Sequence, residues 1–170
     1  MQYCGKEYDL NHLAPCTMQF ERPAKDGMPP VIYSVDVNFS THCFSRKIAP
    51  GESYEKALEC FDGREVRLFD PARWELSHYL PEILRQMGGK KCRHTGHGNY
   101  LSVEVLQQDG GIVEYDIFFR VRKPAKRRLS LYVESAYVRD PQYKSNRPYG
   151  KPVAFLVTLH NTLHGKRIRD

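Results

Sequence analysis

The sequence predicts an α+β fold, in which helices pack on one face of a mostly antiparallel sheet. Four successive stretches have the pattern of strands: 98–107, 111–122, 128–138 and 152–160. Their short connections favour an antiparallel meander. One amphipathic helix precedes them, after Asp70 and Pro71. We therefore expect a meander of four to six strands, with one main helix and one short helix packed on one face.

The composition predicts a compact protein. With 170 residues, 41% hydrophobic and 12% aromatic, the chain can bury a core and does not have the composition of a disordered one. No linker divides it, so we expect a single domain over 1–170, with an irregular, proline-rich arm over 1–30. No apolar run approaches the ~20 residues of a membrane helix, and the first residues lack the apolar core of a signal peptide. The expected protein is cytoplasmic and has no membrane partner.

The first half contains three shorter elements. Residues 31–39 alternate between apolar and polar side chains, which predicts a half-buried strand. A Pro-Gly turn precedes 52–61, which has the pattern of a short helix. An Asp-Gly turn then leads into a strand over 64–69.

The main helix has clear boundaries. Asp70 is the expected N-cap and Pro71 the first helical residue, where proline lacks no needed hydrogen bond. An apolar stripe follows, and Gly88 and Gly89 end the helix. Pro81 lies inside it, so we expect a kink or a break into two short helices.

The pattern of faces predicts the strand register. A three-residue loop ending at a left-handed Gly110 pairs Leu106 with Ile112, which sets Glu104 opposite Glu114 and Ser102 opposite Asp116. Pairing Val121 with Leu129 then puts Asp116 beside Glu134. The open face would therefore carry four acidic residues, near two tyrosines: Glu104, Glu114, Asp116 and Glu134, with Tyr100 and Tyr132. Such a cluster could bind a divalent ion or a basic partner, be covered by cations of the N-terminal arm, or be solvated.

The charge is unevenly distributed. Residues 1–84 hold 9 basic and 13 acidic side chains, a balance of −4, whereas residues 85–170 hold 17 basic and 7 acidic, a balance of +10. A polyanion would meet the second half. The alternative is that these cations only solubilise the surface.

A meander would gather basic and histidine residues at one edge of the sheet. Four strand ends lie together at this edge: the start of the first strand, the end of the second, the start of the third and the end of the fourth. That edge would collect His94, His97, Asn99, Arg120, Arg122, Lys123, Lys126, Arg127, Arg128, His160, Asn161, His164, Lys166 and Arg167. The gathering depends on the strand order 1-2-3-4.

This set suits metal-independent cleavage of RNA. Imidazoles can act as general acid and base near pH 7, and guanidinium groups can neutralise the phosphate. The predicted catalytic residues are His94, His97, His160, His164 and Arg120. The predicted nucleic-acid contacts are Arg122, Lys123, Lys126, Arg127, Arg128, Tyr100, Tyr137, Lys166 and Arg167, in which the tyrosines stack on unpaired bases. No cofactor is expected.

Two alternatives use the same residues differently. A non-catalytic module would bind nucleic acid or protein with the same basic edge. A metal-dependent enzyme would use the acidic face, or Cys92, His94 and His97, with His42 and Cys43 completing a zinc site. The five cysteines show neither a CxxC pair nor a finger spacing, so reduced thiols are the default expectation.

A helix followed by a four-stranded meander, with histidine and basic residues at the sheet edge, resembles the barnase/EndoU/colicin/RelE-like ribonucleases, many of them toxins of bacteria, phages and plasmids. The resemblance covers roughly 70–165, and IVEYDIFFRVRK and RRLSLYVESAYVRD look like the paired central strands. It implies metal-independent RNA cleavage by His, Arg, Lys and Tyr side chains. Expected partners are RNA or another polyanion and an inhibitor protein or host-protein partner. The ~60 residues before the helix and the acidic face depart from the family.

Overall fold

The computed structural model describes residues 2–3, 5–25, 27–95, 98–106, 110–138 and 151–167. The first elements are β1 (Gln2–Tyr3), β2 (Lys6–Glu7), η1 (Asn11–Leu13), β3 (Cys16–Arg22), β4 (Val31–Phe39), η2 (Thr41–Cys43) and β5 (Ser45–Arg46). They are followed by η3 (Lys56–Leu58), β6 (Glu59–Phe61), β7 (Val66–Phe69), α1 (Pro71–Ser77), α2 (Leu80–Arg85) and η4 (Gln86–Gly89). The last are β8 (Lys91–Thr95), β9 (Gly98–Leu106), β10 (Ile112–Ala125), β11 (Arg128–Val138), β12 (Pro152–Ala154) and α3 (Phe155–Leu163).

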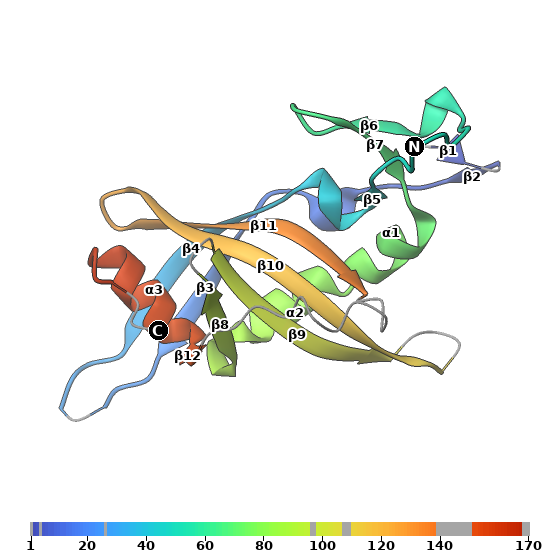
Figure 1. Ribbon diagram of the computed structural model, residues 1–170. Helices are drawn as coiled ribbons and strands as arrows, with labels where there is room; N and C mark the ends of the chain where they lie inside the picture. The colour runs from blue at the N-terminus through green and yellow to red at the C-terminus, as the bar shows by residue number, and fades with distance from the viewer. Residues whose placement is uncertain are drawn as a thin grey trace.

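A curled seven-stranded sheet forms the body of the molecule (Figure 1). Its strand order is β12-β8-β9-β10-β11-β4-β3, and a separate three-stranded sheet has the order β5-β7-β6. β9, β10 and β11 form the expected antiparallel meander. β11 then pairs in parallel with β4. The mixed α/β class is therefore confirmed, with more strands than expected.

The register between β9 and β10 agrees with the sequence. Leu106 lies opposite Ile112, Glu104 opposite Glu114 and Ser102 opposite Asp116. Gly110 has a φ of 84°, the left-handed conformation that glycine adopts without strain. The rest of the predicted loop, 107–109, lies outside the described residues.

The predicted register between β10 and β11 is wrong. Val121 lies opposite Leu131 instead of Leu129. The strands continue to Ala125 and Arg128, and the hairpin turns at Lys126 and Arg127, where Arg127 takes a φ of 62°. A register shift next to Phe118 leaves Glu134 without a direct partner, and Asp116 lies opposite Tyr137. The predicted pairing of Asp116 with Glu134 does not form.

The predicted fourth strand of the meander is also wrong. Only 152–154 is a strand, β12, and it pairs with β8 at the far side of the sheet from β11. The chain then enters α3. Phe155, Thr158 and Leu159 are buried, a spacing of three and four residues that is helical. The apolar residues of 155–160 therefore follow the period of a helix, not the strand that was predicted.

Two expectations for the first half need correction. The arm over 1–30 is not wholly irregular, because it includes β3, an edge strand of the large sheet that pairs with β4 and buries Met18 and Phe20. The short helix expected over 52–61 is only the 3₁₀ turn η3, followed by the strand β6. The strand at 31–39 is confirmed as β4, and the strand expected over 64–69 is confirmed as β7.

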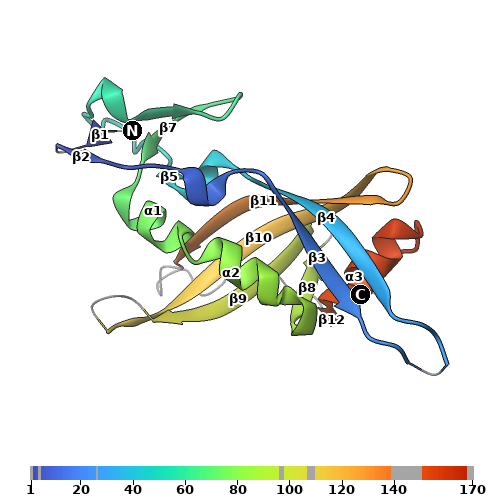
Figure 2. The ribbon, with the colours of Figure 1, turned by 180° about the vertical axis from the view of Figure 1, so that it is seen from behind.

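The main helix begins and breaks as expected. The Asp70 side chain accepts a hydrogen bond from the backbone N–H of Arg73 at 3.1 Å, and Pro71 is the first helical residue. The helix breaks before Pro81, into α1 and α2. Figure 2 shows both helices lying along the inner face of the curled sheet.

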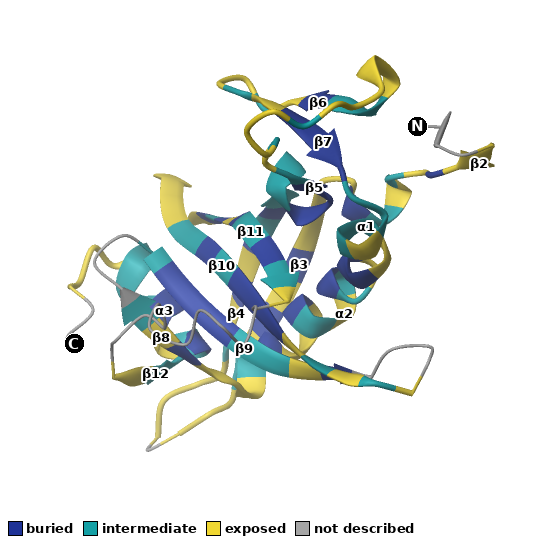
Figure 3. Ribbon diagram, turned by 45° about the vertical axis from the view of Figure 1, so that its right-hand side comes forward, coloured by how far each residue is buried: buried dark blue, intermediate teal, exposed yellow. Residues whose placement is uncertain are grey.

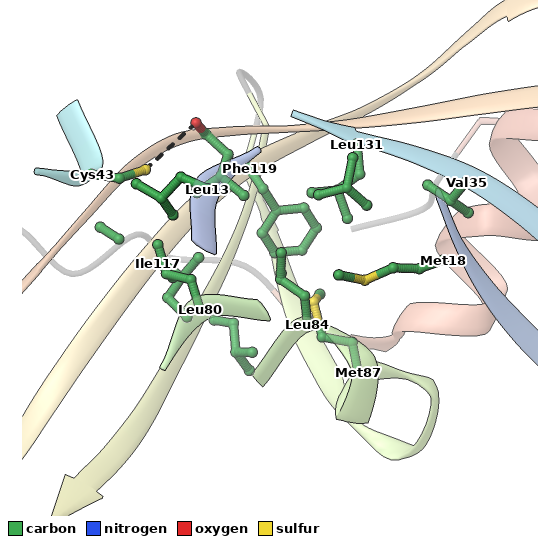
Figure 4. Close-up of a cluster of buried hydrophobic side chains, with 14 of the residues drawn as sticks. Leu13, Met18, Val35, Cys43, Leu80, Leu84, Met87, Ile117, Phe119 and Leu131 are labelled. Carbon is green, nitrogen blue, oxygen red and sulfur yellow. Dashed lines mark hydrogen bonds between the residues drawn. The ribbon is translucent and has the colours of Figure 1, made fainter. Parts of the chain in front are cut away.

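The core lies between this inner face and the helices. Leu80 and Leu84 of α2, and Met87 of η4, point toward Phe119 and Ile117 of β10 (Figure 4). All five are fully buried. Burying a side chain of this size stabilises the fold by about 1.5–3 kcal/mol. Figure 3 shows the same pattern, with buried residues on the long strands and the facing helices and exposed residues at hairpin turns. No helix in the described part of the chain combines the length and the apolar character needed to cross a membrane.

Candidate functional site

The predicted catalytic residues do not gather at one edge. His160 and His164 lie on α3, with ring centroids 4.4 Å apart. α3 packs on the inner face of the sheet, where Phe155 contacts Phe119 at a centroid distance of 6.0 Å. Arg120 follows Phe119 along β10 and therefore points to the opposite, open face. The expected convergence fails because 155–163 is a helix and the strand order is not 1-2-3-4.

The remaining predicted histidines do not complete the set. His94 lies on β8, and its Nδ1 atom is 3.0 Å from the Asn99 side-chain oxygen. Asn99 lies opposite Phe119, on the inner side of β9, and is 5% exposed. His97 lies outside the described residues. His160 Nδ1 is 3.2 Å from the Tyr33 hydroxyl, so this ring is tied to the core face.

The cations among the predicted nucleic-acid contacts fall into two groups. The hairpin cations Arg122, Lys123, Lys126, Arg127 and Arg128 are all exposed at the β10–β11 turn. We call them the basic hairpin. Lys166 and Arg167 are exposed residues after α3, not part of the predicted sheet edge.

The open face contains a polar groove with a volume of about 860 Å³, within the range of ligand pockets. Its floor comes from β4, β10 and β11, and its wall from η2 and the turn between β6 and β7. The lining residues are Asn38, Ser40, His42, Asp62, Arg64, Phe118, Arg120, Arg122, Ser130, Leu131, Tyr132, Glu134 and Ser135. Of the described residues predicted as catalytic or nucleic-acid-binding, only Arg120 and Arg122 line it.

A histidine–aspartate pair stands at one wall of this groove. His42 Nε2 and Asp62 Oδ2 are 2.8 Å apart, and the two side chains are 31% and 13% exposed. Hydrogen bonds from the backbone N–H of Glu65, from the His42 ring and from the backbone N–H of Arg64 hold the pKa of the Asp62 carboxyl far below its ordinary value. The aspartate is therefore ionised and fixed in place.

Sequence reasoning missed this pair. The two residues are 20 positions apart in the chain. From the sequence, Asp62 was interpreted only as part of an Asp-Gly turn. Pairing of β5 and β6 with β7 brings η2 and the β6–β7 turn together. The contact between His42 and Asp62 depends on the packing of the small second sheet, so no sequence motif with a fixed spacing predicts it.

The groove's arginines differ in their partners. Arg120 Nη2 contacts Glu134 Oε1 at 2.8 Å, with both side chains about one-third exposed. Among the described residues, no ion pair engages Arg64 or Arg122. The groove therefore offers two guanidinium groups whose charge is not offset by a bound carboxylate.

The predicted acidic cluster forms only in part. Glu104 and Glu114 are opposed as expected, but Glu114 accepts a hydrogen bond from Ser102 at 3.0 Å. Asp116 is fully buried and accepts the Tyr100 hydroxyl hydrogen bond at 2.7 Å. Glu134 pairs with Arg120. In the described region, the three donors close enough for a metal ion are instead His42, Asp62 and Glu65, whose ligand atoms lie within 4.8 Å of one another.

The alternative zinc set gains no support at Cys92. This thiol is 2% exposed, and burial raises its pKa to about 12. Among the described residues, the donor group close enough to hold a metal ion is His42, Asp62 and Glu65, and Cys92 is not part of it. His97, another member of the set, lies beyond what the structure describes.

The aromatic residues form a row across the open face. Phe118 lies between Tyr100 and Tyr137, with ring centroids 5.0 and 5.7 Å away. Tyr100 is only 4% exposed, so little of its ring can stack on a base. Tyr132, which lines the groove, is 45% exposed. Tyr132 and Phe118 are the better-placed aromatic surfaces.

Comparison with known proteins identifies a family. The model of the YjaZ family matches residues 1–163. The chain belongs to the YjaZ family. It is 29% identical over 145 residues to "Protein YjaZ" of Escherichia coli (strain K12), covering 84% of this chain and 78% of that protein. No solved structure matches it.

This assignment corrects the expected resemblance. The family match spans nearly the whole chain and is to the YjaZ family rather than to the barnase/EndoU/colicin/RelE-like ribonucleases. The resemblance relied on a helix followed by four meander strands, and the fourth of these is mostly the helix α3. A generic order of elements with a basic surface suggested a superfamily that the chain does not match.

Proposed function

We propose that this YjaZ-family protein binds single-stranded RNA across the open-face groove and the adjoining basic hairpin. The observation that carries the proposal is that Arg64 and Arg122, which form no ion pair with any described residue, line one groove with the aromatic rings of Phe118 and Tyr132. Cations that track phosphates beside rings that stack on bases are the two components of single-strand recognition.

Charge supports a polyanion at this surface. Arg122 belongs both to the groove and to the basic hairpin, so the positive surface continues from the hollow to the exposed turn. Among these cations, Arg128 pairs with Asp36 and Arg120 with Glu134. The side chains of both pairs are at least one-third exposed. An exposed ion pair contributes little free energy, so exchanging its carboxylate for a phosphate costs little.

Single strands suit the groove better than duplexes. A base can stack on Tyr132 or Phe118 only when it is not already paired and stacked in a helix. We favour binding over the catalytic scheme expected from sequence, because His160 and Arg120 lie on opposite faces of the sheet.

The first prediction concerns RNA affinity. We expect Arg122→Ala to weaken binding of a fluorescently labelled single-stranded RNA and to lower the slope of log affinity against log salt by about 0.7, the value for one phosphate contact on a single strand. Tyr132→Ala should cost about 1–3 kcal/mol of binding free energy. Fluorescence anisotropy over a salt series measures both.

Two exposed residues outside the groove serve as matched controls. Arg85→Ala removes an arginine of α2, and Tyr54→Ala removes a tyrosine that is 41% exposed. Neither should change affinity. Equal losses for Arg85→Ala and Arg122→Ala would mean that diffuse charge, not the groove, attracts RNA. Equal affinity for duplex and single strand would contradict the stacking role of Tyr132.

A further inference from the structure

The groove holds the His42–Asp62 pair, which RNA binding alone does not need. Both side chains line the same hollow as Arg64, Arg120 and Arg122. An aspartate bound to one ring nitrogen of a histidine orients the ring and stabilises its protonated form, an arrangement that serves general-base catalysis.

Asp62 is held rigidly at its end of the pair. Its Oδ1 atom accepts hydrogen bonds from the backbone N–H groups of Arg64 and Glu65, each at 2.8 Å. Its Oδ2 atom faces His42 Nε2. An ionised carboxylate only accepts hydrogen bonds, so Nε2 of His42 must be the donor. The remaining nitrogen, Nδ1, then carries the lone pair when the ring is neutral.

His42 is fixed from its backbone as well. Its N–H donates to Ser40 Oγ at 3.1 Å, and its carbonyl accepts from Arg73 Nη1 at 3.3 Å. Within the described part of the chain, no hydrogen bond occupies Nδ1 of His42. The ring is therefore positioned at the groove with a basic nitrogen to spare.

We propose that His42 is the general base of an RNA-cleaving site in this groove, with Asp62 as its positioning residue. This inference rests on the proposed binding of RNA in the groove. Nδ1 removes the proton of a ribose 2′-hydroxyl, and the 2′ oxygen forms a bond to the adjacent phosphorus. The bond from phosphorus to the 5′ oxygen breaks, and that oxygen takes a proton from water. His42 returns its proton to the hydroxide so formed.

The products are a 2′,3′-cyclic phosphate and a 5′-hydroxyl, with no net gain or loss of water. Negative charge builds on the phosphate oxygens during the step. Arg64 lies two residues from Asp62, lines the same groove and has no ion-pair partner in the described region, so it is suited to stabilise that charge.

The second prediction tests this site with the full chain and a labelled single-stranded RNA in EDTA. We expect cleavage with 2′,3′-cyclic phosphate ends, and none of a DNA strand of the same sequence, which lacks the nucleophile. His42→Ala should lower the rate about 100- to 10,000-fold without changing RNA affinity. Added imidazole should restore part of the lost rate, because it supplies the missing base.

Asp62→Asn should lower the cleavage rate at unchanged RNA affinity, as expected for a positioning residue. His78→Gln, which changes an exposed histidine of another surface, should behave like the wild type. Circular dichroism confirms that each variant is folded.

Four results would overturn the inference. RNA binding without cleavage would remove the catalytic role and leave the proposed function intact, whereas loss of binding itself would remove both. Equal cleavage by wild type and His42→Ala would identify a contaminating nuclease. Cleavage that EDTA abolishes and Mn²⁺ restores would assign His42, Asp62 and Glu65 to a metal ion instead.

Discussion

His12 lies in an unusual setting for a histidine. Its ring stacks on His78 at a centroid distance of 3.7 Å, and its Nε2 atom is 2.7 Å from Ser77 Oγ. Its Nδ1 atom is buried without a hydrogen-bond partner among the described residues. Burial and the neighbouring His78 lower the pKa of His12 from 6.5 to about 4, although Asp9 opposes the shift. The folded protein therefore holds this ring neutral.

The third prediction follows from this lowered pKa. Between pH 6.5 and about 4 the unfolded chain takes up a proton at His12 that the folded protein refuses, so stability falls over that range and levels off below it. His12→Gln should reduce the loss of melting temperature across this range. Thermal unfolding at a series of pH values measures it.

The comparison is Ala72→Gln, an exposed position of α1 that adds and removes no titratable group and should leave the pH dependence as in the wild type. If His12→Gln and the wild type lose melting temperature in parallel, the stack of His12 on His78 does not resist protonation.

At the scale of single elements, the sequence is most informative where local chemistry decides. Asp70, Pro71 and Pro81 fix the start and the break of the main helix without help from distant residues, and the structure agrees with all three. Gly110 likewise takes the positive φ that the hairpin register requires. Capping and turn geometry depend on residues that are neighbours in the chain, so both can be predicted from the sequence.

The fourth prediction tests the cap of α1. Asp70→Ala removes the acceptor of the Arg73 backbone N–H and should lower the free energy of unfolding by about 1 kcal/mol. Asp70→Asn, which keeps a capping oxygen, should lose much less. Denaturant unfolding compares them with Glu75→Ala, an exposed position on the same helix. A similar loss for Glu75→Ala and Asp70→Ala would exclude a specific capping contribution.

α3 shows where element prediction failed. The stretch 152–160 contains apolar residues that fit both a strand and a helix. Short apolar runs do not distinguish these two states by periodicity alone. The decision depends on what the apolar residues meet. Phe155 lies 5.0 Å from Phe20 and 6.0 Å from Phe119, and a helix places Thr158 and Leu159 against the same surface.

At the scale of the whole molecule, Phe155 joins three distant parts of the chain. Its ring is fully buried and contacts Phe20 of β3 and Phe119 of β10, so it attaches α3 to both of these strands. The parallel pairing of β4 with β11 brings β3 into this position. None of these contacts is local in sequence.

The fifth prediction concerns this junction. Phe155→Ala should lower the free energy of unfolding by about 3–5 kcal/mol, since it leaves a cavity between α3 and the sheet. Val157→Ala, two residues along the same helix and 46% exposed, should have a small effect. Chemical denaturation measures both. A loss below about 1 kcal/mol for Phe155→Ala would mean that α3 is not packed as described.

The sequence by itself determined the local and the periodic features of this protein: the β9–β10 register, the capped and broken helix, the strand β4 and the positive charge of the second half. Each depends on neighbouring residues or on a regular period. The tertiary structure alone decided the strand order, the place of α3 and the composition of the groove. His42 and Asp62 are in contact only because the two sheets pack together. His160 and Arg120 lie on opposite faces because residues 155–163 form a helix and not a strand. Packing of surfaces that are far apart in the chain leaves no spacing pattern to recognise.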